Sequence, residues 1–277
     1  MILTQELGKA SDSQDQGPHY GLDVKRHDVS SISAPELLFD NKSDTLSQEC
    51  VALCTDKVIL SYDLVRAGLE VATPRGANKH KILRGTGIFD DAIVPDMQIS
   101  VGQYLAFLEN IRSQTKGHDI SFLIGSALAH SLIQKGVGYP LWSQTQPDAS
   151  QCLVSIFRFL FYGNETKWRV FPLVFFREFN VSNKCIFIAE VNVDSSKLAQ
   201  FILEIGLCAL VALLKHITGK RVPLRYTFRV VRPRHIADFE THLGLHSAFQ
   251  APLNSVSVDT NFSSFELGDF RSGILHT

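Results

Sequence analysis

The stretch from 194 to 219, DSSKLAQFILEIGLCALVALLKHITG, decides how this chain folds. It opens with an Asp-Ser-Ser run, in which each side chain can accept a hydrogen bond from the free N–H groups of a first helical turn. It closes with a cation-bearing turn and then Gly219, a residue that commonly ends a helix. Every position from 205 to 214 is apolar or glycine. The stretch therefore predicts a central helix at 195–217 that is covered on most sides, by a sheet or by a second copy of the chain.

The length of the apolar run argues against a membrane span. It covers 205–214 only, with Glu204 directly before it, whereas a bilayer core needs about 20 apolar residues. The start of the chain, MILTQELGKASDSQDQ, lacks the long apolar segment of a secretory signal peptide. We expect a soluble, cytoplasmic protein with no membrane partner.

Composition and charge are those of an ordinary globular protein. Apolar residues make up 45% and charged residues 20% of the 277 positions, enough to bury a sizeable core. The net charge of −1 gives no indication of nucleic-acid binding by bulk electrostatics. Five cysteines without paired spacing fit a reducing compartment better than a disulfide framework or a zinc site.

The first part of the chain is polar before any regular element is predicted. Residues 1–42 are rich in Ser, Asp and Gln and predict a flexible N-terminal segment. Residues 47–68 have room for one strand and one helix, and TPRGANKH at 73–80 is typical of a loop.

Two helices are predicted next, and together they form a helical hairpin. Ser100 predicts the N-cap of a helix at 101–113, with Gln103 in place to complete a capping box. A second helix is predicted at 120–133, after a Lys-Gly-His turn.

Strands and helices alternate from residue 136 onwards. The pattern predicts a strand at 136–142, a helix at 149–162, a β-hairpin from 168–180 and 185–193, the central helix, a strand at 224–231, a helix at 235–243 and one or two strands in 249–259. The expected fold class is therefore α+β: an antiparallel sheet with helices packed on one face, preceded by a helical hairpin.

Two long segments carry a family resemblance. LRGTGIFDDAIVPDMQISVGQYLAFLENI at 83–111 has a glycine turn, an acidic stretch, Ile-Ser and a helix ending near Asn110. The run at 222–267 has a strand, a proline, a short helix and a closing strand in that order. Together they resemble the arabinose-binding-like, effector-binding domain of AraC/XylS-family bacterial transcription regulators. The resemblance spans about 83–267 and implies effector binding and dimerisation.

The chain departs from that family in one respect. Family members continue into two helix-turn-helix units that bind DNA, whereas this sequence stops at Thr277. The expected organisation is a flexible segment at 1–42, an effector-binding and dimerisation domain at 43–267 and a tail at 268–277. The expected function is effector sensing without direct DNA contact. The alternative is a protein-interaction module that pairs with a full-length regulator and modulates it.

Aromatic residues supply the predicted ligand site. If a cavity exists, its wall would be Trp142, Phe157, Phe161, Phe175, Phe176 and Phe187, and its ligand largely apolar. Arg177 would meet an anionic group at the rim. Such rings are more often plain core, and such an arginine is more often a solvent-facing strand position.

The central helix supplies the predicted contact of a homodimer. The residues assigned to this contact are Phe201, Ile205, Leu210 and Leu214. A two-fold arrangement is the default for such a pair.

No catalytic motif is recognisable in the sequence. It has no G-x-S-x-G, no H-E-x-x-H and no kinase or dinucleotide-binding pattern. His242 and His246 have a helical i, i+4 spacing, but Gly244 between them marks a helix end. We expect no enzymatic activity, no metal site and no cofactor.

Overall fold

In the computed structural model, a mainly helical part of the described chain is followed by a part that forms a five-stranded sheet with two further helices. The described residues are 57–95, 97–135, 157, 160, 161, 171 and 173–259. All of them lie in the unit Val51–Thr277, one of two into which the chain divides. The predictions that fall outside the described residues are those for 1–42, the strand at 136–142 with Trp142, most of the helix at 149–162, and the tail at 268–277.

A short antiparallel ribbon and one helix begin the described chain. β1 (Lys57–Leu60) pairs with β2 (Gln98–Ser100), and α1 (Tyr62–Ala72) follows β1. The predicted strand and helix are thus confirmed. The loop predicted at 73–80 is wrong in part, because η2 (Thr73–Arg75) and α2 (Lys79–Leu83) begin within it and η3 (Asp90–Ala92) follows.

The next two helices form where the sequence predicts them. α3 (Val101–Gln114) begins with a complete capping box: Ser100 accepts a hydrogen bond from the Gln103 backbone, and the Gln103 side chain accepts one from the Ser100 backbone. α4 (Ile120–Gln134) follows. The two helices are consecutive, yet α4 packs chiefly against α7 and α1.

The sheet has the strand order β3-β4-β7-β5-β6. Its strands are β3 (Val174–Val181), β4 (Lys184–Val191), β5 (Arg225–Thr227), β6 (Ser247–Ala248) and β7 (Asn254–Asp259). The fold class is α+β, but the sheet is mixed, since β5 and β6 run parallel. The reason is topological: α8 (Ile236–His242) carries the chain back between these strands, and a crossover helix makes its two strands parallel.

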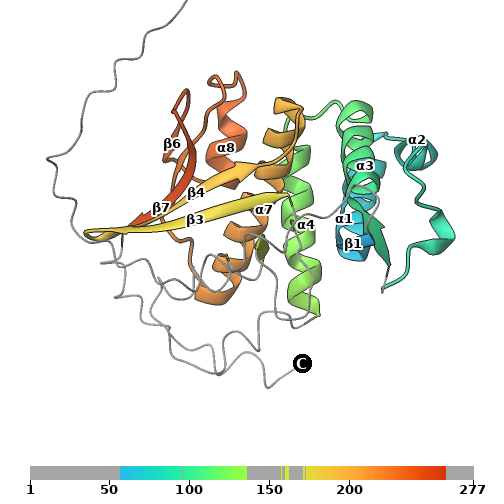
Figure 1. Cartoon of the computed structure of the whole chain (residues 1–277), viewed down its shortest axis with the longest axis horizontal. Coiled ribbons are helices and arrows are strands. Elements are labelled where there is room, and N and C mark those ends of the chain that lie inside the picture. Colours follow the sequence, from blue (N-terminus) through green and yellow to red (C-terminus); the bar gives the residue numbers. More distant parts are fainter. Residues whose placement is uncertain are drawn as a thin grey trace, which may run out of the picture. The chain divides into compact units, whose positions relative to one another are not determined.

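The predicted β-hairpin is confirmed by β3 and β4, which pair antiparallel around Ser182 and Asn183 (Figure 1). The strand expected at 224–231 is shorter than predicted. At Arg229 the backbone N–H donates to the side-chain oxygen of Asn254 at 2.9 Å instead of to a neighbouring strand.

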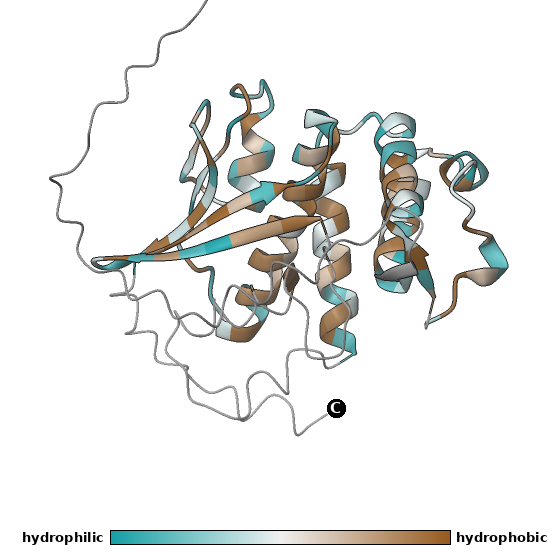
Figure 2. Cartoon of the chain, in the orientation of Figure 1, coloured by the Kyte–Doolittle hydropathy of each residue, from teal (hydrophilic) through white to brown (hydrophobic). Residues whose placement is uncertain are grey.

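The central helix, α7 (Ser196–Thr218), is also confirmed. Ser195 is its N-cap and accepts a hydrogen bond from the Leu198 N–H at 3.3 Å, and Gly219 ends it in the left-handed conformation, with φ of 64°. Figure 1 shows α7 between the sheet and α4, and Figure 2 shows both helices dominated by apolar residues. The two helices pack closely because Gly125 of α4 has no side chain: a Cβ there would lie 2.4 Å from the Ile205 carbonyl oxygen.

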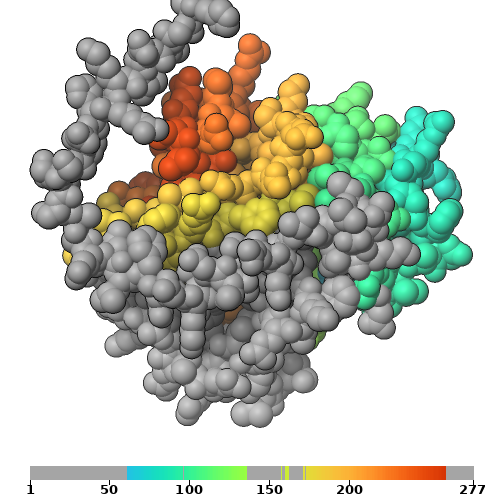
Figure 3. Space-filling model, in the orientation of Figure 1, coloured from blue at the N-terminus to red at the C-terminus, as the bar shows by residue number. Residues whose placement is uncertain are grey.

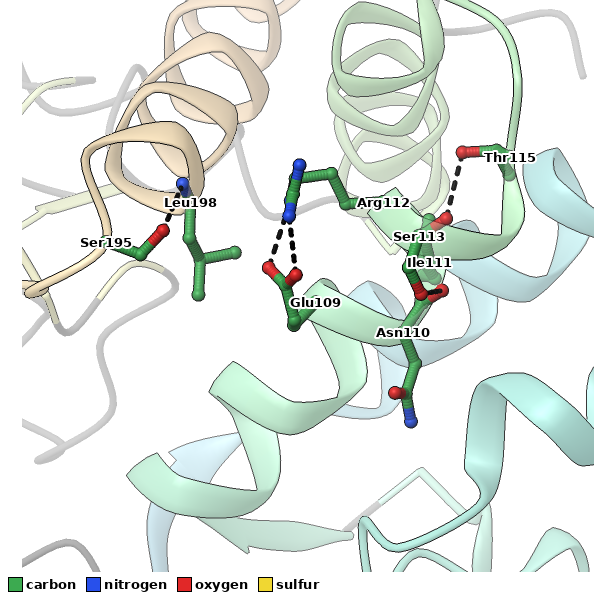
Figure 4. A network of polar contacts seen from close by, with 8 residues as sticks. All are labelled: Glu109, Asn110, Ile111, Arg112, Ser113, Thr115, Ser195 and Leu198. Carbon is green, nitrogen blue, oxygen red and sulfur yellow. Dashed lines mark hydrogen bonds and ion pairs between the residues drawn. The ribbon is translucent and has the colours of Figure 1, made fainter.

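The start of α7 lies beside the end of α3 (Figure 4). On α3, Arg112 donates two hydrogen bonds to the Glu109 carboxylate, at 2.5 and 2.9 Å. These bonds lower the pKa of Glu109, and the charge of Lys197 on α7 adds to the effect. Both residues belong to α3 and are partly exposed, so this i,i+3 pair stabilises the end of α3 only modestly.

α7 is the one helix, among the described residues, that is long and apolar enough to cross a membrane by length and composition. In its most apolar window, 67% of the residues are buried inside the chain. That extent of burial is typical of the core helix of a soluble protein.

Candidate functional site

The structure separates the predicted aromatic site into two groups. Phe157, Phe161, Phe176 and Phe187 lie together, each at most 3% exposed. Phe157 stacks on Phe187 with ring centroids 3.9 Å apart, and Phe176 lies 4.8 Å from Phe157 and 4.4 Å from Phe161. We call these four residues the aromatic cluster. At such distances the rings fill the space between them, so the cluster is packed core and not a cavity wall.

Phe175 and Arg177 lie on the other face of the sheet. Successive side chains of a strand point to opposite faces. Phe175 and Arg177 therefore cannot line the same site as Phe176, which lies between them in the sequence. Phe175 is 36% exposed and Arg177 is also exposed. The prediction of a single ligand site is therefore wrong for Phe175 and Arg177, which lie on the opposite face of the sheet from the aromatic cluster. Trp142 lies outside the described residues.

The four residues predicted for the dimer contact are all buried within the chain. Phe201, Ile205, Leu210 and Leu214 are at most 8% exposed. They belong to the hydrophobic core, which includes residues of α4 and the sheet. None of these side chains is accessible to a second copy in the folded chain, and any contact through α7 would have to use its more exposed residues.

A pocket opens on a different side of α7. Its volume is about 250 Å³. Its lining comes from α4, α7, the connection after α7, and α8. The lining residues are Ser126, Cys208, Val211, Ala212, Lys215, Arg221, Thr241 and His242. We call it the cationic pocket, because Lys215 and Arg221 are the fixed charges of the lining and none of its residues is acidic.

The end of α7 positions the two cations. Lys215 lies in the last turn of the helix. Gly219 reverses the chain through its left-handed backbone, which brings Arg221 back toward α8. There Arg221 Nη2 donates a hydrogen bond to the Thr241 carbonyl at 2.9 Å. Carbonyls at a helix C-terminus attract cations, so α8 holds the guanidinium in place.

His242 forms part of the wall contributed by α8. Its ring stacks on Phe122 of α4, with centroids 5.1 Å apart and planes 5° apart. Phe122 in turn packs edge-on against Phe239. Burial lowers the pKa of His242; the charge of Arg221 lowers it as well, while Asp119 and Asp238 raise it. The imidazole is therefore mainly neutral at pH 7 and can offer a hydrogen bond without adding a charge.

Cys208 and Ser126 meet at the α4–α7 side of the pocket, with Sγ and Oγ 3.2 Å apart. Burial raises the pKa of the Cys208 thiol to about 11. A thiol that stays protonated at neutral pH is a poor nucleophile. Cys208 is therefore poorly suited to act as a nucleophile.

One turn before Cys208, the carboxyl group of Glu204 lies between α7 and α4. It accepts hydrogen bonds from Ser121 Oγ at 2.5 Å and from Gln200 Nε2 at 2.9 Å. Burial raises the pKa of Glu204 to about 7, with a further rise from Asp238 that the two hydrogen bonds oppose. Its charge therefore changes near neutral pH.

Sequence reasoning missed the cationic pocket. The sequence indicates only a cation-bearing turn at the end of the central helix, which contains Lys215, and it marks His242 only as half of a weak metal motif. Within the described part of the chain, no three His, Cys, Asp or Glu residues converge to hold a metal ion. Nothing in the sequence pairs the end of α7 with α8, because that contact depends on how the crossover helix returns over the sheet.

No protein-family model matches the chain, and no curated protein is significantly similar to it.

Proposed function

We propose that this chain is the effector-sensing and dimerisation module of an AraC-type bacterial transcription regulator, acting in the cytoplasm. The family resemblance in the sequence suggests this role, and the cationic pocket is the observation that carries it. Fold class alone would not distinguish a sensor from many other proteins.

The position of the pocket supports sensing because its walls come from separate elements. A ligand there would touch Ser126 of α4, Lys215 of α7 and His242 of α8 at once. A ligand shifts a conformational equilibrium only by binding one arrangement better than another. One that bridges three elements favours the arrangement in which all three are together.

Native mass spectrometry of the purified chain tests the proposal. We expect a dimer, with a small molecule retained in the wild type and lost in Ala212→Leu, which narrows the pocket. The matched control is Ala237→Leu, an exposed position on α8 outside the pocket lining. A bare monomer, with no retained molecule in any variant, would contradict both parts of the proposal.

A second candidate is a protein-interaction module that pairs with a full-length regulator. It is favoured by the outer face of β3, an edge strand of the described sheet. Phe175, Phe179 and Val181 are 36, 44 and 56% exposed there, and the β3–β4 hairpin forms a strip of the molecular surface, yellow in Figure 3. Exposed apolar side chains on an edge strand are suited to pairing with another chain.

Phe179→Glu tests the interaction surface on β3. If the outer face of β3 is the interaction surface, sedimentation analysis should show loss of self-association or regulator binding, with small-molecule retention unchanged. Lys184→Glu, an exposed change in the same hairpin, is the control. If Phe179→Glu leaves all association intact, the outer face is not the interaction surface.

A further inference from the structure

We infer that the cationic pocket binds a small organic anion, with its carboxylate or phosphate head between Lys215 and Arg221 and its apolar part against Val211 and Ala212. This assignment rests on the proposed sensing function and names the class of effector. It differs from the sequence-based expectation of a largely apolar ligand among aromatic rings.

The charge of the pocket is the first argument. Lys215 makes no ion pair with any described residue, and the hydrogen bond from Arg221 Nη2 to the Thr241 carbonyl leaves the other N–H groups of Arg221 without a described protein acceptor. Two cations beside a lining without carboxylates leave a positive charge that an anion would compensate. A guanidinium binds carboxylate or phosphate through paired hydrogen bonds, which an ammonium group supplements as a point charge.

The carboxylates near the pocket lie outside its lining. On α8, Asp238 acts on His242 and Glu204, and Asp119 at the start of α4 acts on His242. Neither carboxylate is part of the lining. Glu204 on α7 is hydrogen-bonded to Ser121 and Gln200, outside the pocket.

The apolar part of the site is the second argument. Val211 and Ala212 line the pocket from α7 and are only partly buried by the chain itself. Covering them with the body of a ligand would remove apolar surface from water. A bare inorganic ion would leave this surface exposed, so an organic anion fits better.

The volume limits the size of the ligand. About 250 Å³ is the space of roughly eight water molecules in the liquid, and drug-sized ligands occupy pockets of about 300–1,000 Å³. A molecule about as large as benzoate fits. A nucleotide or a dinucleotide cofactor does not.

Titration calorimetry with benzoate and benzamide tests the inference, because the two have nearly the same shape and differ in charge. We expect benzoate to bind at least about tenfold more tightly than benzamide, in keeping with the extra strength of charge-assisted hydrogen bonds. Rising salt should weaken benzoate binding. Lys215→Met should weaken benzoate binding about tenfold or more. Arg221→Lys should weaken it less, because it keeps the positive charge and loses only the paired N–H donors of the guanidinium.

Lys197→Met is the matched control, since Lys197 is an exposed lysine on the same helix, remote from the pocket lining. It should leave benzoate binding unchanged. Equal affinity for benzoate and benzamide, or no benzoate binding at all, would overturn the anion assignment. Either result would leave the sensing function standing if mass spectrometry finds a retained molecule that Ala212→Leu expels. A bare monomer would instead remove the sensing function itself.

Discussion

α7 borders one region that is tightly packed and another that contains an open pocket. Toward the sheet, its Gly206 faces the aromatic cluster so closely that a Cβ would lie 3.0 Å from the Phe161 ring. Toward α8, the same helix leaves an opening of about 250 Å³ beside Lys215 and Arg221. Apolar rings pack at the density of a protein interior, whereas the pocket is lined by two cations and by apolar side chains that stay partly exposed. The difference suggests that stability depends mainly on the first region and ligand binding on the second.

Phe157→Ala should have the largest effect on stability. Phe157 is fully buried and contacts three other rings of the cluster, so truncation should lower the free energy of unfolding by about 3–5 kcal/mol. Denaturant titration measures this change. The control is Phe175→Ala on the exposed face of β3, which should cost less than about 1 kcal/mol. Equal losses of stability for the two variants would mean that the aromatic cluster is not tightly packed.

The fold could be read from the sequence wherever local signals were sufficient. The capping box at Ser100 and the Gly219 stop each depend on residues a few positions apart and formed as predicted, and the predicted cap in the Asp-Ser-Ser run is supplied by Ser195. The parallel pairing of β5 and β6 could not be read in this way, because it depends on where α8 returns the chain.

The candidate site was harder to predict than the fold. Phe175, Phe176 and Arg177 were assigned to one site, although the two-residue period of a strand places Phe176 opposite the other two; that signal was available in the sequence. The meeting of Lys215, Arg221 and His242 was not, since it is a tertiary contact between the end of α7 and the end of α8.

Glu204→Gln should have the next largest effect, and its sign depends on pH. The folded-state pKa of Glu204 is raised to about 7 from 4.5, so ionisation destabilises the fold. Stability from this group is fully present below about pH 4.5 and is lost as pH rises through about 7. The loss of unfolding free energy is at most about 3 kcal/mol. Partial exposure of the side chain to solvent reduces it further. Glutamine does not ionise, and its amide can keep both contacts by accepting from Gln200 Nε2 with its oxygen and donating to Ser121 Oγ with its nitrogen. The variant should therefore be more stable than the wild type at pH 8.

The measurement is the free energy of unfolding at several pH values from 4 to 8. Gln200→Ala is a useful comparison, because it removes one of the hydrogen bonds that lower the pKa of Glu204. It should steepen the loss of stability toward high pH, whereas Glu204→Gln should flatten it. Parallel pH profiles for wild type and Glu204→Gln would show that this carboxyl group does not titrate with folding.

The smallest effects come from a matched pair of enlargements. Ala189 on β4 is buried and pairs with Phe176 of the aromatic cluster, so Ala189→Leu should cost about 1–3 kcal/mol through overpacking. Ala212 lines the cationic pocket, and Ala212→Leu should change the free energy of unfolding by no more than about 0.5 kcal/mol. The same variant should nevertheless abolish benzoate binding, because the new side chain occupies the space of the ligand. Comparable destabilisation by both leucines would show that the cationic pocket is as tightly packed as the cluster. The contrast between the two sides of α7 would then have no physical basis.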